Sequence, residues 1–558
     1  MLRLRRKLLV VAISSILVFS AIWFFTDLRY WGAAVIHVPG DVPSIQRAIK
    51  LVRAGGTVKV SSGTYRESLV IDKPVNLMGE NMTNTVIDGE GKTETLIDIE
   101  ASSVRISGFT IRGAERAILY SSGRVQRCVI EGNIIRDNTY GIHFDVSWIR
   151  TQECIIRDNI IRNNEFGILV ESAPNRVPRC IIANNTFVNN RYVAIDLFNV
   201  RNSVIVNNTF IRNDLGIRLR NSLNSTLRWN NLTNNRIGIS ISPFSREMFK
   251  HVDSSNLVDG RPIYWFFGED GLVVDPKRFP KVGLLVVMNS MNVTVRGIEV
   301  GGNEYGMVMV NVSYSLIEGV HASDNDYGIA VIRSNNVTVR GCTTTNNNYG
   351  GIYVQNSEGV VIQESCSYRD RWNGIHIDRS VRCVVSHNMI RGLPGKTATT
   401  SGIRLSSSRH IFVYNNTVVG GDCGITLENS PNNLICQNTF QNNTYSGILL
   451  LESHWNEIQG NNILYNRYAF DLFESTHNTI YHNNVIGNEY AIFPGHYLSP
   501  NSWDFGYPTG GNYWDDYEGS DEDGDGIGDT PYIKEGIIRD NYPLMKPWNG
   551  TETCGGPP

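Results

Sequence analysis

Apolar and polar residues alternate in short stretches of the chain, and these stretches recur along its length. In most copies a glycine precedes the stretch, and the residues one and three positions after it are apolar, as with Ile142 and Phe144 after Gly141. The residue between them is usually polar or variable, so the pattern predicts a strand with one buried face. The marking residues are Gly141, Gly167, Gly216, Gly238, Gly306, Gly328, Gly351, Gly374, Gly402, Gly424 and Gly447, with Ala194, Ala469 and Ala491 in three further copies.

The interval between marks is mostly 22 or 23 residues, and it is longer where a loop bulges out. Gly260 and Gly283 would keep the period between Gly238 and Gly306. Such a repeat predicts an all-β fold, a right-handed single-stranded parallel β-helix with three short strands in each coil of about 22 residues. A leucine-rich repeat has a similar period, but its apolar consensus differs.

Asparagines recur eight and three residues before the mark, as at Asn133 and Asn138 before Gly141. Asparagine tolerates the left-handed turn conformation, and stacked asparagine side chains can form hydrogen bonds from one coil to the next. These positions therefore predict turns that are held together by ladders of asparagine.

Both ends of the solenoid have features that predict caps. Pro43 and Ser44 begin a short segment with Ile45, Ala48, Ile49 and Val52 on one face, followed by glycines 55 and 56, and this predicts a capping helix on the first coil. We expect the β-helix to occupy residues 38–500 and a C-terminal cap to occupy residues 501–558.

The first 30 residues form a separate segment. Four basic residues precede an uncharged apolar run at 8–25, which is long enough to cross a bilayer as a helix. The basic flank places the N-terminus inside, so the sequence predicts a single-pass signal-anchor with the bulk of the chain extracytoplasmic. A cleavable signal peptide is the alternative, but bulky residues at 22–25 leave no clear cleavage site.

Positive and negative charges nearly balance, with 51 Lys and Arg against 54 Asp and Glu. This balance argues against a nucleic-acid partner that binds a broadly basic surface.

Candidate chemistry lies at positions two and four after each mark, which point outward and form columns along the coils. Residues in the same column lie about 5 Å apart when they are one coil apart, and about 10 Å apart when they are two coils apart. These two distances bracket the carboxylate spacings of glycosidases. The catalytic candidates are Asp145, Glu171, Asp196, Asp378 and Glu428, and the ligand-binding candidates are His143, Arg218, Arg220, Tyr353, His376 and Arg404. A glycan-binding groove, a catalytic groove and a plain solvated face are all compatible with this pattern.

Nine cysteines occur, and Cys128, Cys154 and Cys180 stand at equivalent positions with inward parity. Stacked buried thiols are most often small core residues. A disulfide or a soft-metal thiolate site is the alternative, although a sealed core offers a metal no route of entry.

A second metal candidate lies near the C-terminus, at residues 521–529. Asp521, Asp523, Asp525 and Asp529 occupy positions one, three, five and nine of this segment, and glycine occupies position six. That spacing matches a calcium-binding loop, in which the Ile527 carbonyl would be a further ligand. Tyr532 stands where such a loop has a bidentate glutamate, so we expect a weaker calcium site that stabilises the cap.

Several motifs resemble one known family. The residues Gly63-Thr64-Tyr65, Ile87-Asp88-Gly89, the segment 256–264 and the C-terminal strings at 511–517 and 540–544 are similar to those of NosD-like, carbohydrate-binding and sugar hydrolase (CASH) β-helices of the pectin-lyase-like superfamily. The resemblance implies the fold. It also implies copper handling, since NosD is an accessory factor for copper-site assembly in nitrous oxide reductase.

Taken together, these patterns predict a membrane-anchored surface β-helix that binds glycans or partner proteins along its face. A polysaccharide lyase or glycoside hydrolase is the first alternative, and a NosD-like accessory factor for copper-site assembly is the second. A lyase or hydrolase would need a catalytic carboxylate pair, and a copper factor would need an accessible cluster of Cys, His or Met.

Overall fold

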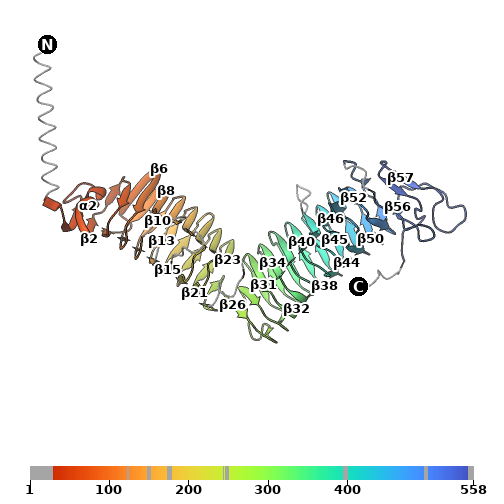
Figure 1. Ribbon diagram of the computed structural model, residues 1–558, viewed down its shortest axis with the longest axis horizontal. Coiled ribbons are helices and arrows are strands. Elements are labelled where there is room, and N and C mark those ends of the chain that lie inside the picture. Colours follow the sequence, from red (N-terminus) through yellow and green to blue (C-terminus); the bar gives the residue numbers. More distant parts are fainter. Residues whose placement is uncertain are drawn as a thin grey trace, which may run out of the picture. The chain divides into compact units, whose positions relative to one another are not determined.

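The computed structural model describes residues 29–121, 125–146, 153–172, 179–242, 244, 251–393, 400–495 and 500–550. Nearly all of these residues belong to a right-handed parallel β-solenoid of about 19 turns, which confirms the predicted fold class (Figure 1). The chain divides into two compact units, residues 1–260 and 261–558. The predicted signal-anchor at 1–30 lies almost entirely outside the described residues, and no helix within them is long and apolar enough to cross a membrane.

In the first unit each regular coil contributes three parallel strands. The first strands form one sheet: β1 (Ala33–Val38), β2 (Val52–Val60), β5 (Val75–Gly79), β7 (Arg105–Ser107), β9 (Val129–Glu131), β12 (Cys154–Arg157), β15 (Cys180–Ala183), β18 (Val204–Val206), β21 (Thr226–Arg228) and β24 (His251–Val252). The second strands are β10 (Ile134–Arg136), β13 (Ile160–Arg162), β16 (Thr186–Val188), β19 (Thr209–Ile211), β22 (Asn231–Thr233) and β25 (Leu257–Val258). The third strands are β11 (Tyr140–Val146), β14 (Phe166–Ser172), β17 (Val193–Phe198), β20 (Leu215–Arg220) and β23 (Ile237–Ser242). The early coils use β3 (Gly63–Tyr65), β4 (Leu69–Ile71) and two long strands, β6 (Thr85–Ile99) and β8 (Thr110–Tyr120).

The second unit repeats the three-strand coil. Its first strands are β27 (Val273–Val274), β29 (Thr294–Arg296), β32 (Ser313–Glu318), β35 (Asn335–Arg340), β38 (Val361–Gln363), β41 (Val384–Ser386), β44 (Phe412–Tyr414), β47 (Leu434–Cys436), β50 (Glu457–Gln459) and β53 (Thr479–Tyr481). Its second strands are β30 (Glu299–Gly301), β33 (His321–Ser323), β36 (Thr343–Thr345), β39 (Cys366–Tyr368), β42 (Met389–Arg391), β45 (Thr417–Val419), β48 (Thr439–Gln441), β51 (Asn462–Leu464), β54 (Asn484–Ile486) and β56 (Tyr513–Trp514). Its third strands are β26 (Arg261–Phe267), β28 (Leu284–Met288), β31 (Tyr305–Val310), β34 (Tyr327–Ile332), β37 (Gly350–Gln355), β40 (Asn373–Asp378), β43 (Ser401–Ser406), β46 (Cys423–Glu428), β49 (Ser446–Leu451), β52 (Tyr468–Phe473) and β55 (Tyr490–Ile492). One antiparallel hairpin, β57 (Tyr532–Lys534) with β58 (Ile538–Asp540), lies in the C-terminal part.

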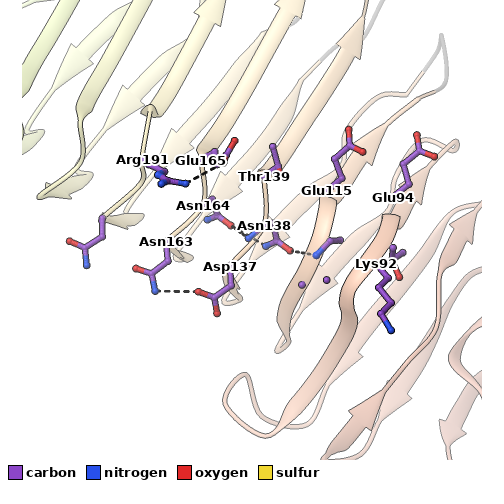
Figure 2. Close-up of a pocket in the computed structure, with 15 residues that line it drawn as sticks. Lys92, Glu94, Glu115, Asp137, Asn138, Thr139, Asn163, Asn164, Glu165 and Arg191 are labelled. Carbon is purple, nitrogen blue, oxygen red and sulfur yellow. Dashed lines mark hydrogen bonds and ion pairs between the residues drawn. The ribbon is translucent and has the colours of Figure 1, made fainter.

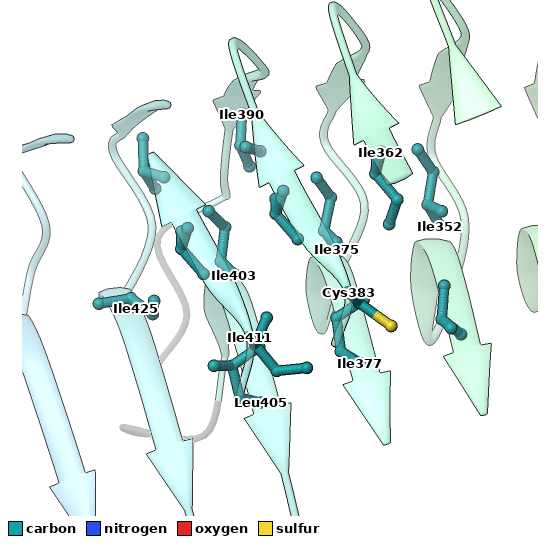
Figure 3. Close-up of a cluster of buried hydrophobic side chains, with 14 of the residues drawn as sticks. Ile352, Ile362, Ile375, Ile377, Cys383, Ile390, Ile403, Leu405, Ile411 and Ile425 are labelled. Atoms are coloured by element: carbon teal, nitrogen blue, oxygen red, sulfur yellow. The ribbon is translucent and has the colours of Figure 1, made fainter. Parts of the chain in front are cut away.

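The core of the second unit is a stack of aliphatic side chains that repeat from coil to coil (Figure 3). Ile352, Ile375 and Ile403 occupy the same register position on β37, β40 and β43 and are almost fully buried. Burial of one such side chain contributes about 1.5–3 kcal/mol. The alternation that predicted these strands therefore also forms the continuous core.

The marking glycines allow adjacent coils to approach closely. A Cβ atom at Gly141 would lie 2.6 Å from the carbonyl oxygen of Gly167, and one at Gly424 would lie 2.5 Å from that of Gly447. Between Gly238 and Gly306, however, the register pairs Ile263 with Leu284, and pairs Leu285 with Met307. The position equivalent to Gly306 is therefore Leu284, and the expectation that Gly260 and Gly283 are the missing marks is wrong.

The predicted asparagine ladders are present in the turns. In one ladder of the first unit, the Nδ2 atom of each asparagine donates to the Oδ1 atom of the next at 2.9–3.2 Å, through Asn133, Asn159, Asn185, Asn208, Asn230 and Asn256. The same Oδ1 atoms accept the backbone N–H of the preceding asparagine, and Nδ2 also donates to backbone carbonyls. The ladders thus satisfy polar groups that the tight turns bury.

The predicted capping helix is also present, as α2 (Ile45–Leu51). Ser44 is its N-cap, and the Ser44 hydroxyl accepts a hydrogen bond from the Arg47 backbone N–H. The helix buries Ile45, Ala48 and Ile49 and contacts β1, β2 and β4. The helix ends at Leu51, because Val52 already belongs to β2. It is therefore shorter than predicted, since the sequence suggested that it continues to glycines 55 and 56.

Candidate functional site

The first candidate surface is the outward side of the third strands in the first unit. One column places His143 beside Leu169, then Asp196 and Arg218, on β11, β14, β17 and β20. The second column places Asp145 beside Glu171, followed by Phe198 and Arg220. The sequence candidates of this unit therefore lie on adjacent strands of one sheet.

Asp196 is the fixed point of this surface. Its side chain is fully buried, and its carboxylate accepts hydrogen bonds from Arg218 Nη2 at 2.6 Å and from Arg220 Nη2 at 2.8 Å. Arg220 also lies 3.8 Å from Glu171 and 4.9 Å above the Phe198 ring. A buried carboxylate that accepts hydrogen bonds from two guanidinium groups is suited to position those arginines.

His143 stands at the other end of the same column. Its ring stacks on Tyr140 at 4.8 Å, and burial lowers the pKa of the imidazole, so the ring is neutral at neutral pH. The Nδ1 atom is buried, and within the described part of the chain it has no hydrogen-bond partner. A buried polar nitrogen without a partner costs free energy, so this atom is an exception among the buried polar groups of the described coils.

A shallow polar concavity of about 810 Å³ lies next to this surface, along the turns that precede the third strands (Figure 2). Figure 2 shows Glu94, Glu115 and Glu165 with their carboxylates on the same side, and Thr139 occupies the coil between Glu115 and Glu165. Arg116 lies 2.9 Å from Glu94, and Arg191 lies 3.7 Å from Glu165. This concavity was not predicted from the sequence, because its side chains lie before the marking residue of each coil, whereas the predicted columns lie after it.

The second candidate surface is the outward side of the third strands in the second unit. Tyr353, His376 and Arg404 follow one another on β37, β40 and β43. The neighbouring column contains Gln355, Asp378, Ser406 and Glu428, the last of which lies on β46. As in the first unit, the register brings the sequence candidates onto one continuous sheet.

Hydrogen bonds join the members of these two columns into two neighbouring groups, which together form the polar network of this surface. Asp378 accepts from Gln355 Nε2 at 2.9 Å, from Arg379 Nη2 at 3.0 Å and from the Tyr353 hydroxyl at 3.3 Å. Farther along, Arg404 Nη2 donates to Glu428 Oε2 at 2.6 Å, and His376 Nε2 lies 3.1 Å from Ser406 Oγ. These polar groups are held in place before any ligand binds.

The electrostatics of the network fix its charge states. Burial and the Arg404 guanidinium lower the pKa of His376 to about 4, so this ring is neutral at neutral pH. Burial opposes ionisation of Asp378, but hydrogen bonds from Arg379 and Gln355 outweigh it and hold the pKa of the carboxyl below its usual value. Burial and the nearby Asp378 carboxylate raise the pKa of Tyr353. The surface therefore presents a carboxylate, a neutral imidazole and a neutral phenol.

A ladder of aromatic rings leads into this network. Tyr327 stacks on Tyr305 at 5.5 Å and on Tyr353 at 4.7 Å, and Tyr353 lies 5.2 Å from the His376 ring. On the outer side, Tyr327 lies 5.7 Å from Tyr349. Trp372 packs edge-on against Tyr349 at 5.7 Å, and its side chain is 52% exposed. Tyr349 and Trp372 each lie two residues before the marking glycine, a position that the repeat pattern did not single out.

The acidic loop near the C-terminus brings three of its predicted ligands together. One carboxylate oxygen from each of Asp521, Asp523 and Asp525 lies within 4.8 Å of the others. Asp529 instead accepts the Glu522 backbone N–H at 2.7 Å, and Ile527 forms a bridge with Leu544. Three converging carboxylates are an oxygen donor set that suits a hard cation such as Ca²⁺.

Tyr532, at the twelfth position of the predicted loop, belongs to the interior of the cap. Its ring is buried and stacks on Trp514 at 4.5 Å, and its hydroxyl donates to Asp516 at 2.9 Å. The predicted loop therefore ends in the packing of the cap, and its twelfth position supplies no carboxylate.

The three stacked cysteines are buried free thiols: Cys128 directly precedes β9, and Cys154 on β12 lies beside Cys180 on β15 in the register. Burial raises the pKa of Cys128 to about 11 and that of Cys180 to about 12, so these thiols stay protonated. The reading of these residues as core fillers agrees with this burial, and the disulfide alternative does not, because all three are unpaired. A different cysteine, Cys436, is disulfide-bonded.

The stacked cysteines and the acidic loop are also the candidates for a copper site. Copper binds thiolate, imidazole and thioether groups that can be reached from solvent. The stacked thiols are buried and protonated, and the metal-type cluster found within the described residues consists of aspartates alone. These residues do not fit copper.

The coils, ladders and caps define a right-handed parallel β-helix protein with polar and aromatic columns on the outer side of its third strands. The family described as "Periplasmic copper-binding protein (NosD)" matches residues 76–250 and 396–519, and "Right handed beta helix region" matches residues 281–399. Because the first match covers more than half of the 558 residues, the chain belongs to the NosD family. The description of this family as periplasmic agrees with an extracytoplasmic location for the bulk of the chain.

No curated protein matches the sequence. Solved structures with similarity include the mannuronan C-5 epimerase AlgE4 A-module of Azotobacter vinelandii, with 15% identity over 85% of this chain and 97% of that chain and a TM-score of 0.25. PfbA, a surface adhesin of Streptococcus pneumoniae, has 13% identity over 77% of this chain and 91% of that chain, with a TM-score of 0.26. An alginate lyase from Paenibacillus sp. has 12% identity over 69% and 94%, with a TM-score of 0.23. At these identities and scores the similarity does not bear on activity.

Proposed function

We propose that this protein is an extracytoplasmic β-helix that binds glycans on the third-strand surface of its second unit, without cleaving them. The observation that carries the proposal is the aromatic ladder that runs from the exposed Trp372 through Tyr349 and Tyr327 to the Tyr353–Asp378 network. The ladder comes from β34 and from the turns that precede β37 and β40, and the network lies on β37, β40, β43 and β46.

A sugar ring has an apolar face and hydroxyl groups at its edge, so it needs both an aromatic platform and fixed hydrogen-bonding partners. Trp372 and Tyr349 supply the platform, and Asp378 and Arg404 supply the partners. Because Asp378 and Arg404 are already held by neighbouring side chains, little side-chain entropy is lost when a ligand binds.

The protonation states favour binding over hydrolysis by an acid/base glycosidase. A glycosidase of the acid/base type needs one carboxyl group whose pKa is raised, so that it carries a proton at neutral pH. The pKa of Asp378 is lowered instead, and His376 is neutral at neutral pH. Asp196, the corresponding candidate in the first unit, is occupied by Arg218 and Arg220.

Two further parts of the proposal concern the ends of the chain. The apolar run at 8–25 anchors the protein in the membrane, with the β-helix outside. The Asp521, Asp523 and Asp525 carboxylates bind Ca²⁺ and thereby stabilise the C-terminal cap. The Cys436 disulfide supports the outside location, because such bonds persist in oxidising compartments.

The test is a glycan array probed with the full chain in detergent, followed by depletion assays on the polysaccharides that bind. Trp372→Ala should weaken binding by about tenfold, since an aromatic contact contributes about 0.5–1.5 kcal/mol in addition to the apolar area that it buries. Trp229→Ala is the matched control, because Trp229 is similarly exposed at 59% but lies in the first unit. New reducing or unsaturated ends in the depletion assay would overturn the non-enzymatic proposal, and equal binding by both variants would overturn the assigned surface.

A further inference from the structure

A pocket of about 380 Å³ lies on a different sheet of the second unit, over the first strands β41, β44, β47 and β50. Its floor is a column in which Val384, Phe412, Leu434 and Glu457 follow one another in register. The first three are apolar and the last is a carboxylate. The floor therefore spans four coils, or about 14 Å at the usual strand spacing.

The rim of the pocket is formed by the turns that precede these strands. Arg382, His410, Asn432 and Trp455 occupy the same turn position in successive coils, and each has a positive φ of 52–59°. This repeated left-handed turn presents four different side chains in a row along one edge of the floor. All four can form hydrogen bonds, and the fourth, Trp455, combines its N–H donor with an apolar indole ring.

Trp455 is exposed and yet fixed in position. Its side chain is 60% exposed, and its ring stacks on His477 of the next coil at 4.3 Å. In the floor, the Phe412 ring stacks on Tyr414 at 4.4 Å. An exposed indole that is supported from one side offers its other surfaces to a ligand at little entropic cost.

The polar groups stand at the two ends of the pocket. Arg382, at one end, pairs with Glu358, and Glu457, at the other end, accepts a hydrogen bond from the Tyr481 hydroxyl at 2.7 Å. Both side chains are thereby oriented, and a carboxylate or guanidinium group can form further hydrogen bonds. The two ends therefore offer one acceptor and one donor on either side of an apolar centre.

We infer that this pocket is a second glycan subsite, which binds a pyranose ring against Trp455 with its hydroxyl groups directed to Glu457 and His410. A ligand with an apolar face and a polar edge matches this lining, and the volume lies in the range of ligand pockets. The inference rests on the proposed glycan-binding function and extends it to a second sheet of the same coils. A chain with two subsites gains avidity for a polymer that reaches both.

The subsite is tested by titrating the full chain in detergent with oligosaccharide fragments of alginate, pectin, cellulose and chitin. Isothermal titration calorimetry gives the affinity and the number of molecules bound per chain. Three exposed tryptophans provide the variants: Trp455→Ala for the pocket, Trp372→Ala for the third-strand surface and Trp229→Ala as the control. Thermal unfolding of each variant shows whether it is folded, and Trp455→Phe retains an aromatic ring at the pocket.

For at least one fragment class we expect two molecules per chain in the parent and in Trp229→Ala, and one in either Trp455→Ala or Trp372→Ala. Trp455→Phe should retain both, with the affinity at the pocket reduced less than about tenfold. If Trp455→Ala is folded and still binds two molecules, or if the parent binds one molecule that only Trp372→Ala removes, the second subsite is overturned. If Trp455→Ala removes the one bound molecule and Trp372→Ala has no effect, the pocket stands and the proposed third-strand surface fails.

Discussion

At the scale of single residues, the chain's polar chemistry is decided by which charges are paired. Asp196 and Asp378 both emerged from the sequence as acid/base candidates, and the register places them in the expected columns, but both side chains are buried, whereas the alternation predicted that they point outward. Their partners were not predictable, because Arg218, Arg220 and Arg379 could equally have pointed into solvent. The pairing makes these two carboxylates organisers of arginine side chains, which a pattern of alternating positions does not reveal.

The ion pairs of Asp196 provide a residue-scale prediction. Asp196→Asn leaves Arg218 and Arg220 without their buried anion, and we expect a loss of about 2 kcal/mol in stability, discounted because both guanidinium groups are partly exposed. Urea denaturation measures this loss. The control is Asp214→Asn, whose exposed pair with Arg236 should contribute less than about 1 kcal/mol. Equal effects of the two substitutions would contradict the organising role of Asp196.

Asp540 provides a second residue-scale prediction, on pH dependence. Its carboxyl is buried and accepts hydrogen bonds from the Asn512 and Tyr542 backbone N–H groups and from Trp514 Nε1, and burial raises its pKa to about 6. Between about pH 4 and pH 6 the folded cap keeps a proton that the unfolded chain has lost. The contribution of Asp540 to the free energy of unfolding is therefore fully present below pH 4. This contribution decreases by up to about 3 kcal/mol as the pH rises to 6.

The check is thermal unfolding of the parent and of Asp540→Asn across this pH range. The substituted side chain does not titrate, so the difference in unfolding temperature between the two proteins should change between pH 4 and pH 6 and stay constant above pH 7. A constant difference at all pH values would mean that Asp540 is ionised throughout.

At the scale of elements, the repeat is maintained by close coil contacts at the glycines and by the asparagine ladders. Both follow from the sequence, because the spacing of Asn133 and Gly141 relative to the strands recurs in most coils. The turns of the first-strand sheet were less accessible to prediction. Trp455 and His410 share a turn position with Arg382 and Asn432, and four unrelated side chains give no repeat signal even though their backbone conformation is the same.

The ladder predicts unequal effects for two neighbouring asparagines. Asn208 is buried and bonds to Asn185, Asn230 and two backbone carbonyls, so Asn208→Ala should destabilise the first unit by about 3 kcal/mol. Asn207 is exposed with a φ of 57°, and Asn207→Gly should cost less than about 1 kcal/mol because glycine tolerates that conformation. Hydrogen exchange of the flanking strands would report the difference, and equal protection in both variants would contradict the ladder's role.

At the scale of the whole molecule, the sequence predicted one β-helix over residues 38–500, and the structure contains two compact units that meet in sequence at residue 260. The division between the units lies where two successive coils lack the marking glycine. In these coils Ile263 and Leu284 occupy the register position that glycine has elsewhere. A period count can bridge such a gap without detecting the change in register. The boundary of the C-terminal cap, expected at residues 501–558, stays a prediction.

The acidic loop leads to a prediction on calcium. Ca²⁺ should raise the unfolding temperature of the C-terminal cap, and a chelator should reverse this, because a ligand that binds only the folded loop stabilises it. Asp523→Asn should abolish the shift, whereas Glu522→Gln, which changes an exposed carboxylate outside the cluster, should retain it. An identical response of both variants, or none in the parent, would mean that the three aspartates are a solvated turn.

The central claim is that the third-strand surface of the second unit binds glycans, and hydroxyl-radical footprinting of the full chain tests it most directly. With a glycan selected from the array at saturating concentration, oxidation of Trp372 and Tyr349 should fall several-fold, while oxidation of Trp229 in the first unit stays unchanged. Unchanged oxidation of Trp372 while the glycan is demonstrably bound would contradict the account and place the binding surface elsewhere.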